Sequence, residues 1–336
     1  MELLTSSRLR AWRRCKRYER LAYVEGWRPA VENEHLHIGS LIHEGLEAWY
    51  RACAAGEASE AYAAAMAAVD GRARDPITQV KVQELLWGYD AHWFGQELEV
   101  LGVEEEFRIP LYNPETWKPS RTWEYAGKID VRVRRPEGQV WIMEHKSSSQ
   151  YIDDPTAPYW RQLDMDHQVS AYFLGAEALA GGDEQLAPRG CIYDVIRKPG
   201  LRPHLATPPE KRKYKKVTGE LYANMREFDE TPEEYRARLH EDIEQNLERY
   251  FVRREVPRTE SQLIDFLSDA WMEARIMREA HLAARAPRDP DACHAFGTCQ
   301  FWQICALGVD PAQSHEFVRT ETAHPELSEE IQGGQA

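Results

Sequence analysis

Hydrophobic positions recur at helical spacing in both outer parts of the chain and at strand spacing in the middle. Around Ile42, Leu46 and Trp49 the apolar residues share one face, which is typical of an amphipathic helix. Thr5 and Ser6 are candidates for the cap that begins the first helix. This spacing predicts single helices at about 5–25, 38–55 and 166–180, and two more within 57–100. Helices are also predicted from about 230 onward, broken near Pro257 and ending before Pro287.

The period changes to two in the middle of the chain. Apolar and polar residues alternate in Val103–Leu111 and again in Trp123–Arg134. The turn residues Pro136–Gln139 follow, and the apolar run Val140–Met143 then begins another strand, so we predict a hairpin. Gly190–Ile196 is a further predicted strand. These strands predict a small mixed sheet between a helical N-terminal segment and a helical C-terminal segment.

The pattern predicts an α/β (α+β) fold that forms one domain over residues 1–336. With 336 residues, of which 43% are apolar, the chain can bury a sizeable core. The expected divisions are a helical segment at 1–100, the sheet core at 101–200, a second helical segment at 201–310 and a polar tail at 311–336.

Composition excludes several classes of protein. No stretch approaches eighteen consecutive apolar residues and no secretory signal is visible, so we expect a cytoplasmic protein with no membrane partner. Six cysteines are too few for a disulfide scaffold. The net charge of −14 opposes binding of polyanions at long range. Two basic segments, 1–20 and 197–217, nevertheless allow local phosphate contacts, although either could be an ordinary solvated stretch.

The chemistry of the predicted hairpin is the strongest functional signal. Glu144 and Lys146 project from the same face of one strand because side chains alternate with period two. The turn lies midway between Asp130 and Glu144, so the two carboxylates can meet across the strands. Paired carboxylates suit Mg²⁺ or Mn²⁺, and a neighbouring lysine can stabilise phosphate charge or act on a water molecule. A surface ion pair at a strand end is the structural alternative.

Four motifs together resemble those of one nuclease family. Gly127–Asp130 followed by Glu144–Lys146 resembles the core of the PD-(D/E)XK nuclease superfamily. Gly39–His43 resembles the upstream G-x-x-x-H element of its RecB-type branch, and Gln168–Tyr172 resembles the downstream Q-x-x-x-Y helix motif. The run Tyr159–Gln168 is similar to phage and prophage members. The motifs occur in the expected order.

The resemblance implies a restriction-endonuclease-like sheet core and a role for each matching residue. Lys146 would position or activate the attacking water, and Gln168 and Tyr172 would orient DNA or Lys146. The implied ligands of one or two Mg²⁺ or Mn²⁺ ions are His43, Asp130, Glu144 and the main-chain carbonyl of His145.

Each added motif also has a purely structural explanation. His43 lies on the apolar face of its helix and could be a core histidine, and Gln168 and Tyr172 could be a packing pair on one helix face. Glu104 is a candidate for the acidic residue that precedes the Gly-x-Ile-Asp strand in relatives. Its neighbours Glu105 and Glu106 compete for that role, so the position stays open.

The cysteines suggest a metal centre. In a reducing compartment, clustered thiolates usually bind a metal. One N-terminal and three C-terminal cysteines resemble the [4Fe–4S] ligands of the AddB-type nuclease and of CRISPR-associated exonucleases, although their C-x5-C-x5-C spacing departs from the usual pattern. Zn²⁺ is the main alternative, and unliganded thiols are another. Cys53 and Cys191 are predicted to be packing residues. The four predicted ligands are Cys15, Cys293, Cys299 and Cys305.

We therefore expect metal-dependent hydrolysis of DNA, most consistent with an exonuclease in recombination, repair or phage DNA processing in a bacterial or phage-infected cell. No P-loop motif occurs, so any unwinding requires a helicase or recombination protein as partner. The alternatives are an inactive DNA-binding or assembly subunit and a restriction-type endonuclease. The candidate contacts to the DNA backbone are Arg13, Arg14, Lys211, Arg212, Lys213, Lys215 and Lys216.

Overall fold

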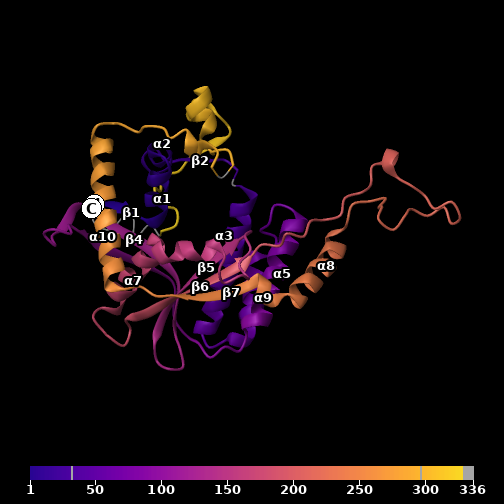
Figure 1. Ribbon diagram of the computed structural model, residues 1–336, viewed down its shortest axis with the longest axis horizontal. Coiled ribbons are helices and arrows are strands. Elements are labelled where there is room, and N and C mark those ends of the chain that lie inside the picture. The colour runs from indigo at the N-terminus through magenta and orange to yellow at the C-terminus, as the bar shows by residue number, and fades with distance from the viewer. Residues whose placement is uncertain (32, 296, 328–336) are drawn as a thin grey trace.

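A six-stranded mixed sheet forms the centre of the molecule (Figure 1). The computed structural model describes residues 1–31, 33–295 and 297–327. Two further short strands, β2 and β8, pair antiparallel in a separate ribbon. The strands are β1 Glu2–Leu4, β2 Trp27–Pro29, β3 Glu99–Tyr112, β4 Pro119–Arg134, β5 Val140–Ser148, β6 Pro188–Arg197, β7 Phe251–Val256 and β8 Phe317–Arg319.

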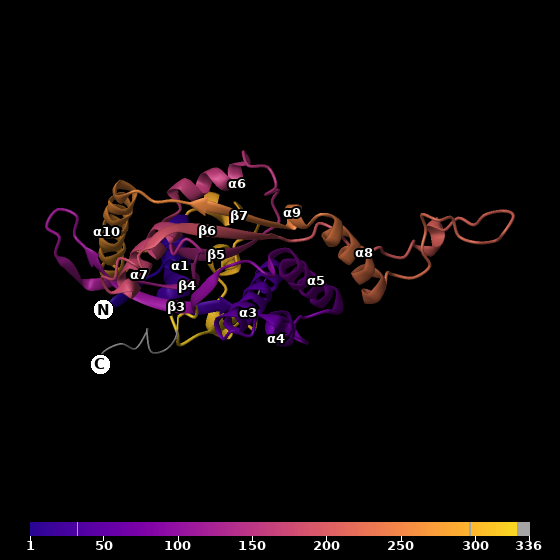
Figure 2. The ribbon, with the colours of Figure 1, turned by 90° about the horizontal axis from the view of Figure 1, so that it is seen from below.

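Helices cover both faces of the sheet, as the predicted α/β class requires. One core cluster joins the sheet to α3, α4, α5 and α8, and another joins it to α1, α7 and α10. Figure 2 shows α3, α4 and α5 together below the sheet. The helices are α1 Ser6–Arg14, α2 Lys16–Glu19, α3 Glu34–Ala54, α4 Ala61–Val69, α5 Pro76–Trp93, α6 Pro158–Arg161, α7 His167–Ala180, α8 Pro232–Gln245, α9 Leu247–Tyr250 and α10 Glu260–Leu282.

The sheet forks beside strand β4. Strand β3 pairs antiparallel with β4 along one edge. On the other edge, β1 pairs with residues 123–125 and β5 pairs with 131–134. Within the described residues, 126–130 therefore have no strand on that side. Beyond the fork β5 continues as the parallel partner of β6 as far as Ser148, so Asp130 lies where the two strands separate.

The first predicted helix is interrupted at Cys15. Thr5 caps α1 as expected, because its hydroxyl accepts a hydrogen bond from the Arg8 N–H at 3.1 Å. Cys15 then adopts an extended conformation with φ −167°, and helix resumes at Lys16. The main-chain N–H of Asp289 donates to the Cys15 sulfur at 3.4 Å. The break thus turns this thiol toward the distant C-terminal segment.

Short strands occupy several stretches where the sequence predicts helix or tail. Strand β7 lies in the helical segment predicted at 201–310. It joins the sheet beside β6, and Phe251 and Val256 at its two ends are buried. β1 and β2 likewise interrupt the helical segment predicted at 1–100. The predicted polar tail is structured in its first residues, because β8 pairs with β2. Residues 328–336 of that tail lie outside the described residues. These strands form through pairing with distant segments, which local periodicity does not report.

Residues 201–230 form an arm that extends past α8, away from the sheet (Figures 1 and 2). Antiparallel contacts hold its two sides together, since the Tyr222 N–H donates to the Lys213 carbonyl at 3.2 Å. At its base, Arg238 donates to Glu230 at 2.6 Å. Within the described ranges, no helix has the length and hydropathy needed to cross a bilayer.

Candidate active site

The fork brings the predicted hairpin residues together. Asp130 Oδ2 accepts a hydrogen bond from the His145 main-chain N–H at 2.8 Å, taking the place of the missing strand partner. Glu144 and Lys146 share one face of β5 and form an ion pair. From α3, His43 Nδ1 approaches to 3.8 Å from the same Asp130 oxygen. Two adjacent strands of the hairpin and a distant helix, α3, thus converge at one point.

Helix α7 adds the two residues of the predicted Q-x-x-x-Y motif. The Gln168 side-chain amide donates to Glu144 Oε1 at 2.9 Å and to the Tyr172 hydroxyl at 2.8 Å. Asp166 caps this helix by accepting from the Gln168 main-chain N–H at 2.7 Å, which sets where the helix begins. The two motif residues therefore share a helix face as predicted, and Gln168 orients the Glu144 carboxylate.

Burial dominates the electrostatics of Glu144. Its residue is fully buried, and burial together with the nearby charge of Asp130 raises the pKa of Glu144 to about 8. Burial opposes the charge of Lys146, but the carboxylates of Glu144 and Asp130 outweigh it and raise the pKa of Lys146 above its ordinary value. Lys146 is therefore a cation that offsets the paired carboxylates.

His43 and Asp130 favour opposite charge states: the imidazole is neutral and the carboxyl is ionised. Burial lowers the pKa of His43 to about 4, although Asp130 acts in the other direction. The imidazole is therefore neutral at pH 7, which is the form that binds a metal. Burial opposes ionisation of Asp130, yet His43, His145 and Lys146 together hold the pKa of Asp130 below its ordinary value. The site thus offers an ionised carboxylate beside a neutral imidazole.

The donors of this cluster suit a hard divalent cation. Glu144 Oε2 is buried and accepts no hydrogen bond from the described residues. No three His, Cys, Asp or Glu side chains in the described ranges of the chain already lie in the arrangement of a metal site, and Lys146 occupies the other Glu144 oxygen. Two carboxylates and a neutral imidazole match the preferences of Mg²⁺ and Mn²⁺. By their chemistry, Asp130, Glu144 and His43 fit such an ion.

Glu104 of the acidic triplet lies near enough to Asp130 for the two carboxylates to interact. It pairs with Lys128, and burial together with nearby Asp130 raises the pKa of Glu104. Glu105 instead pairs with Arg132 at 2.6 Å. The backbone at Glu104 has φ +55°, a conformation that costs energy for a residue with a side chain and is often found beside functional sites. Alternation along the strand could not identify it, because this backbone departs from regular strand geometry.

The four predicted cluster cysteines line a single cavity. Their other neighbours there include Tyr18, Phe301 and Trp302, so the thiols face an apolar pocket. Burial raises the pKa of the Cys299 and Cys305 thiols. Thiolate sulfur is the donor type of iron–sulfur clusters and of many Zn²⁺ sites, but in the described residues no three of these thiols already lie in the arrangement of a metal site. The residues concerned are Cys15, Cys293, Cys299 and Cys305.

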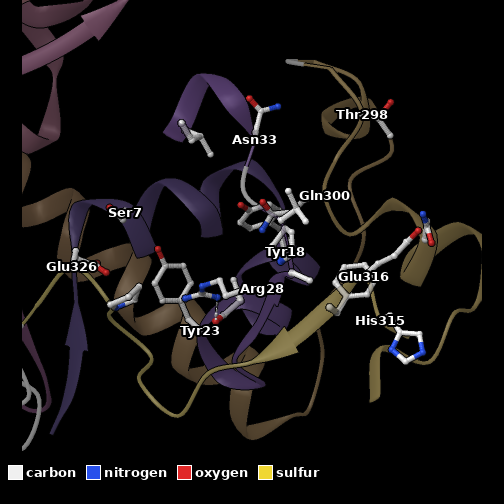
Figure 3. Close-up of a pocket in the computed structure, with 18 residues that line it drawn as sticks. Ser7, Tyr18, Tyr23, Arg28, Asn33, Thr298, Gln300, His315, Glu316 and Glu326 are labelled. Atoms are coloured by element: carbon white, nitrogen blue, oxygen red, sulfur yellow. Dashed lines mark hydrogen bonds between the residues drawn. The ribbon is translucent and has the colours of Figure 1, made fainter. Parts of the chain in front are cut away.

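A larger cavity, of about 840 Å³, lies beside the cysteine segment (Figure 3). Tyr18, Tyr23 and Arg28 line it from the N-terminal side, and Leu36 from the first turns of α3. His43 follows on the same helix, roughly 10 Å further along its axis at 1.5 Å per residue. The described lining includes none of the fork residues, so this cavity is separate from the candidate active site.

The predicted DNA contacts fall into two groups. Arg13 pairs with Glu273 at 3.2 Å, and Arg14 donates weakly to a main-chain carbonyl at 3.5 Å and lies over the Tyr18 ring, so both are engaged within the protein. The second group, Lys211, Arg212, Lys213, Lys215 and Lys216, lies on the arm. Among the described residues, three of these lysines form no ion pair: Lys211, Lys213 and Lys216.

Comparison with known families agrees with this geometry. The model of the PD-(D/E)XK nuclease superfamily matches residues 3–306. The chain belongs to this superfamily. PD-(D/E)XK nucleases are hydrolases that act on phosphodiester bonds.

Two solved structures extend the comparison over most of this PD-(D/E)XK chain. A proposed exonuclease from Eubacterium rectale is 10% identical, with a TM-score of 0.44, and the match covers 92% of this chain and 94% of that one. The structure of SSO0001 is 14% identical, with a TM-score of 0.29, and the match covers 90% and 96%. No curated protein sequence matches significantly.

Proposed function

We propose that this protein is a metal-dependent deoxyribonuclease that acts as an exonuclease at DNA ends. The observation that carries the proposal is the convergence of Asp130, Glu144 and Lys146 at the fork of the sheet, with His43 3.8 Å from Asp130. Two buried carboxylates at one site cost desolvation energy, which a bound cation would offset. Membership of a nuclease superfamily supports the same conclusion.

Each residue would have a separate role in phosphodiester hydrolysis. Asp130, Glu144 and His43, with the His145 carbonyl, would hold Mg²⁺ or Mn²⁺. The bound ion would lower the pKa of water and neutralise charge on the scissile phosphate. Lys146 would orient the attacking water, whose oxygen forms the new bond to phosphorus as the bond to the leaving sugar oxygen breaks.

The Gln168 side-chain amide of α7 would keep the catalytic carboxylate in place. Gln168 donates to both Glu144 and Tyr172, so this pair would hold Glu144 toward the cation. The resemblance of Gly39–His43 to the histidine motif of RecB-type nucleases favours exonuclease action over cleavage within a strand. A helicase or recombination protein would then supply single strands or ends in the cytoplasm.

The four cysteines would hold a structural [4Fe–4S] cluster, with Zn²⁺ as the alternative. The support is that residues almost 300 positions apart line one cavity. Such a centre would join Cys15, at the break between α1 and α2, to the segment with Cys293, Cys299 and Cys305. Its role would be to hold both ends of the chain against the catalytic core.

Cleavage of end-labelled DNA tests the proposed function. Protein purified without oxygen would be incubated with Mn²⁺ and with single- or double-stranded DNA labelled at either end. We expect stepwise loss from one end, and at least a hundredfold slower cleavage by the Glu144→Gln and Lys146→Ala variants. Tyr62→Phe, on α4, is the control and should cleave at the wild-type rate.

The other outcomes separate the competing functions. Cleavage of a closed circle would identify an endonuclease instead. A folded wild-type protein that binds Mn²⁺ but cleaves neither substrate would refute the nuclease activity and favour an inactive DNA-binding subunit.

A further inference from the structure

A buried polar cluster lies behind the catalytic strand, on the face opposite Glu144 and Lys146. His145, Asp194 and Arg253 are direct neighbours across three strands, because β5 pairs His145 with Asp194 and β6 pairs Asp194 with Arg253. His145 is 2% exposed and Asp194 is fully buried. Three charged or ionisable side chains therefore form one continuous row inside the protein.

Asp194 is the centre of this row. Its Oδ2 lies 3.2 Å from His145 Nδ1 and 3.0 Å from Arg253 Nε, and the Tyr89 hydroxyl donates to it at 2.6 Å. Arg253 also donates to the hydroxyls of Tyr89 at 2.8 Å and Tyr50 at 3.0 Å. The carboxylate is thus contacted from β5, β7 and α5, and Tyr50 of α3 supports its partner Arg253. A buried carboxylate with fixed partners holds its own neighbours in place in return.

We propose that Asp194 is a positioning residue for the metal site. Through its 3.2 Å contact with the His145 ring, it restricts the main chain of His145, whose N–H donates to Asp130 Oδ2 at 2.8 Å. The orientation of the Asp130 carboxylate is then set from behind the sheet. This inference rests on the proposed function, in which Asp130 and the His145 carbonyl bind the cation. Groups that orient metal ligands typically change metal affinity 10–100-fold when they are removed.

A purely structural role must be distinguished, and the protein contains a matched control. Glu84 of α5 is also a buried carboxylate that contacts a histidine and an arginine: His240 Nδ1 lies 2.8 Å from it and Arg236 donates at 2.6 Å. Both of these partners lie on α8, away from the fork. Glu84→Gln and Asp194→Asn therefore remove the same kind of charge, and only the second lies behind a proposed metal ligand.

Calorimetric titration of the folded proteins with Mn²⁺, beside thermal unfolding, tests the proposal. We expect both substitutions to lower the unfolding temperature, but only Asp194→Asn to weaken Mn²⁺ binding, by about tenfold or more. Glu84→Gln should bind Mn²⁺ within about twofold of the wild type. Should Asp194→Asn fail to fold, Tyr89→Phe, which removes one donor to the carboxylate, should weaken binding by about threefold or more.

The proposal is overturned if the folded Asp194→Asn variant binds Mn²⁺ as tightly as the wild type. It is also overturned if Glu84→Gln loses as much Mn²⁺ affinity as Asp194→Asn does. If Asp194→Asn does not fold, unchanged Mn²⁺ affinity of the folded Tyr89→Phe variant overturns it. A wild type that binds no Mn²⁺ overturns both this proposal and the nuclease function. A wild type that binds Mn²⁺ without cleaving DNA refutes the nuclease function only, because the comparison of variants still decides the role of Asp194.

Discussion

Two glycines leave room for one aromatic ring beside the active site. A Cβ atom added at Gly127 of β4 would lie 2.7 Å from the Phe107 ring, and one at Gly175 of α7 would lie 2.5 Å from it. Phe107 is buried and meets Tyr172 edge to face, with ring centroids 6.1 Å apart. The glycine of the Gly-x-Ile-Asp motif thus has a packing role, because it accommodates the Phe107 ring, which Gly175 of α7 in turn contacts.

We expect Gly127→Ala to destabilise the protein by about 1–3 kcal/mol, because the added methyl group overpacks a buried ring. Chemical denaturation would measure the change in the free energy of unfolding. The cost should shrink in a Phe107→Leu background, where the aromatic ring that causes the clash is absent. An unchanged cost in that background, or a stability of Gly127→Ala equal to the wild type, would show that Phe107 does not restrict the site.

At the scale of elements, the arm at 201–230 carries exposed positive charge. Lys211, Lys213 and Lys216 are exposed, and in the described structure no carboxylate pairs with them. The protein as a whole carries a net charge of −14, so the long-range field does not attract DNA. A basic arm that extends away from the acidic body can contact a phosphate backbone with less repulsion.

Replacing both Lys213 and Lys216 by Glu should weaken DNA binding and reduce its salt dependence. Each lost phosphate contact should lower the slope of log affinity against log salt by about 0.9 on duplex DNA. Fluorescence anisotropy in EDTA, at several salt concentrations, would measure both quantities. The matched control is Lys118→Glu with Arg121→Glu, which adds the same charge at the β3–β4 end. An equal loss in that control would assign the effect to net charge rather than to the arm.

At the scale of the whole molecule, the two ends of the chain are joined on one side of the catalytic sheet. Strand β2 pairs with β8, and the Tyr18 ring meets Phe301 with centroids 5.0 Å apart. Figure 1 shows the C-terminal segment beside α2 and β2. The cavity lined by four cysteines lies in the same region. A metal bound there would stabilise the fold, since ligands this distant come together only in the folded state.

Cys299→Ser should therefore lose the bound metal and lower the unfolding temperature, whereas Cys53→Ser should do neither. Cys53 lies on α3, outside the cavity. Elemental analysis of protein purified without oxygen would distinguish iron from zinc, and thermal unfolding would report the stability. A Cys299→Ser variant with wild-type metal content would refute the cysteine site, and a wild type with neither metal would do the same.

The sequence determined the α/β class, the hairpin and the order of the motifs, because each follows from patterns among residues that are close in the chain. Alternation over Trp123–Arg134 and Val140–Met143 placed Glu144 and Lys146 on one face, as β5 has them. Spacing of four put Gln168 and Tyr172 on one face of α7. These features depend on the geometry of one strand, one hairpin or one helix, and neighbouring residues suffice to specify them.

Only the tertiary structure decided which residues the motif side chains contact. The fork that exposes Asp130 to the His145 amide depends on β1 and β5 sharing one edge of β4. The row from His145 to Arg253 depends on the register of three strands. Glu104, whose carboxylate interacts with that of Asp130, has an irregular backbone that alternation does not report. Such contacts join residues that are distant in the chain, and their energy comes from burial and pairing that no local pattern records.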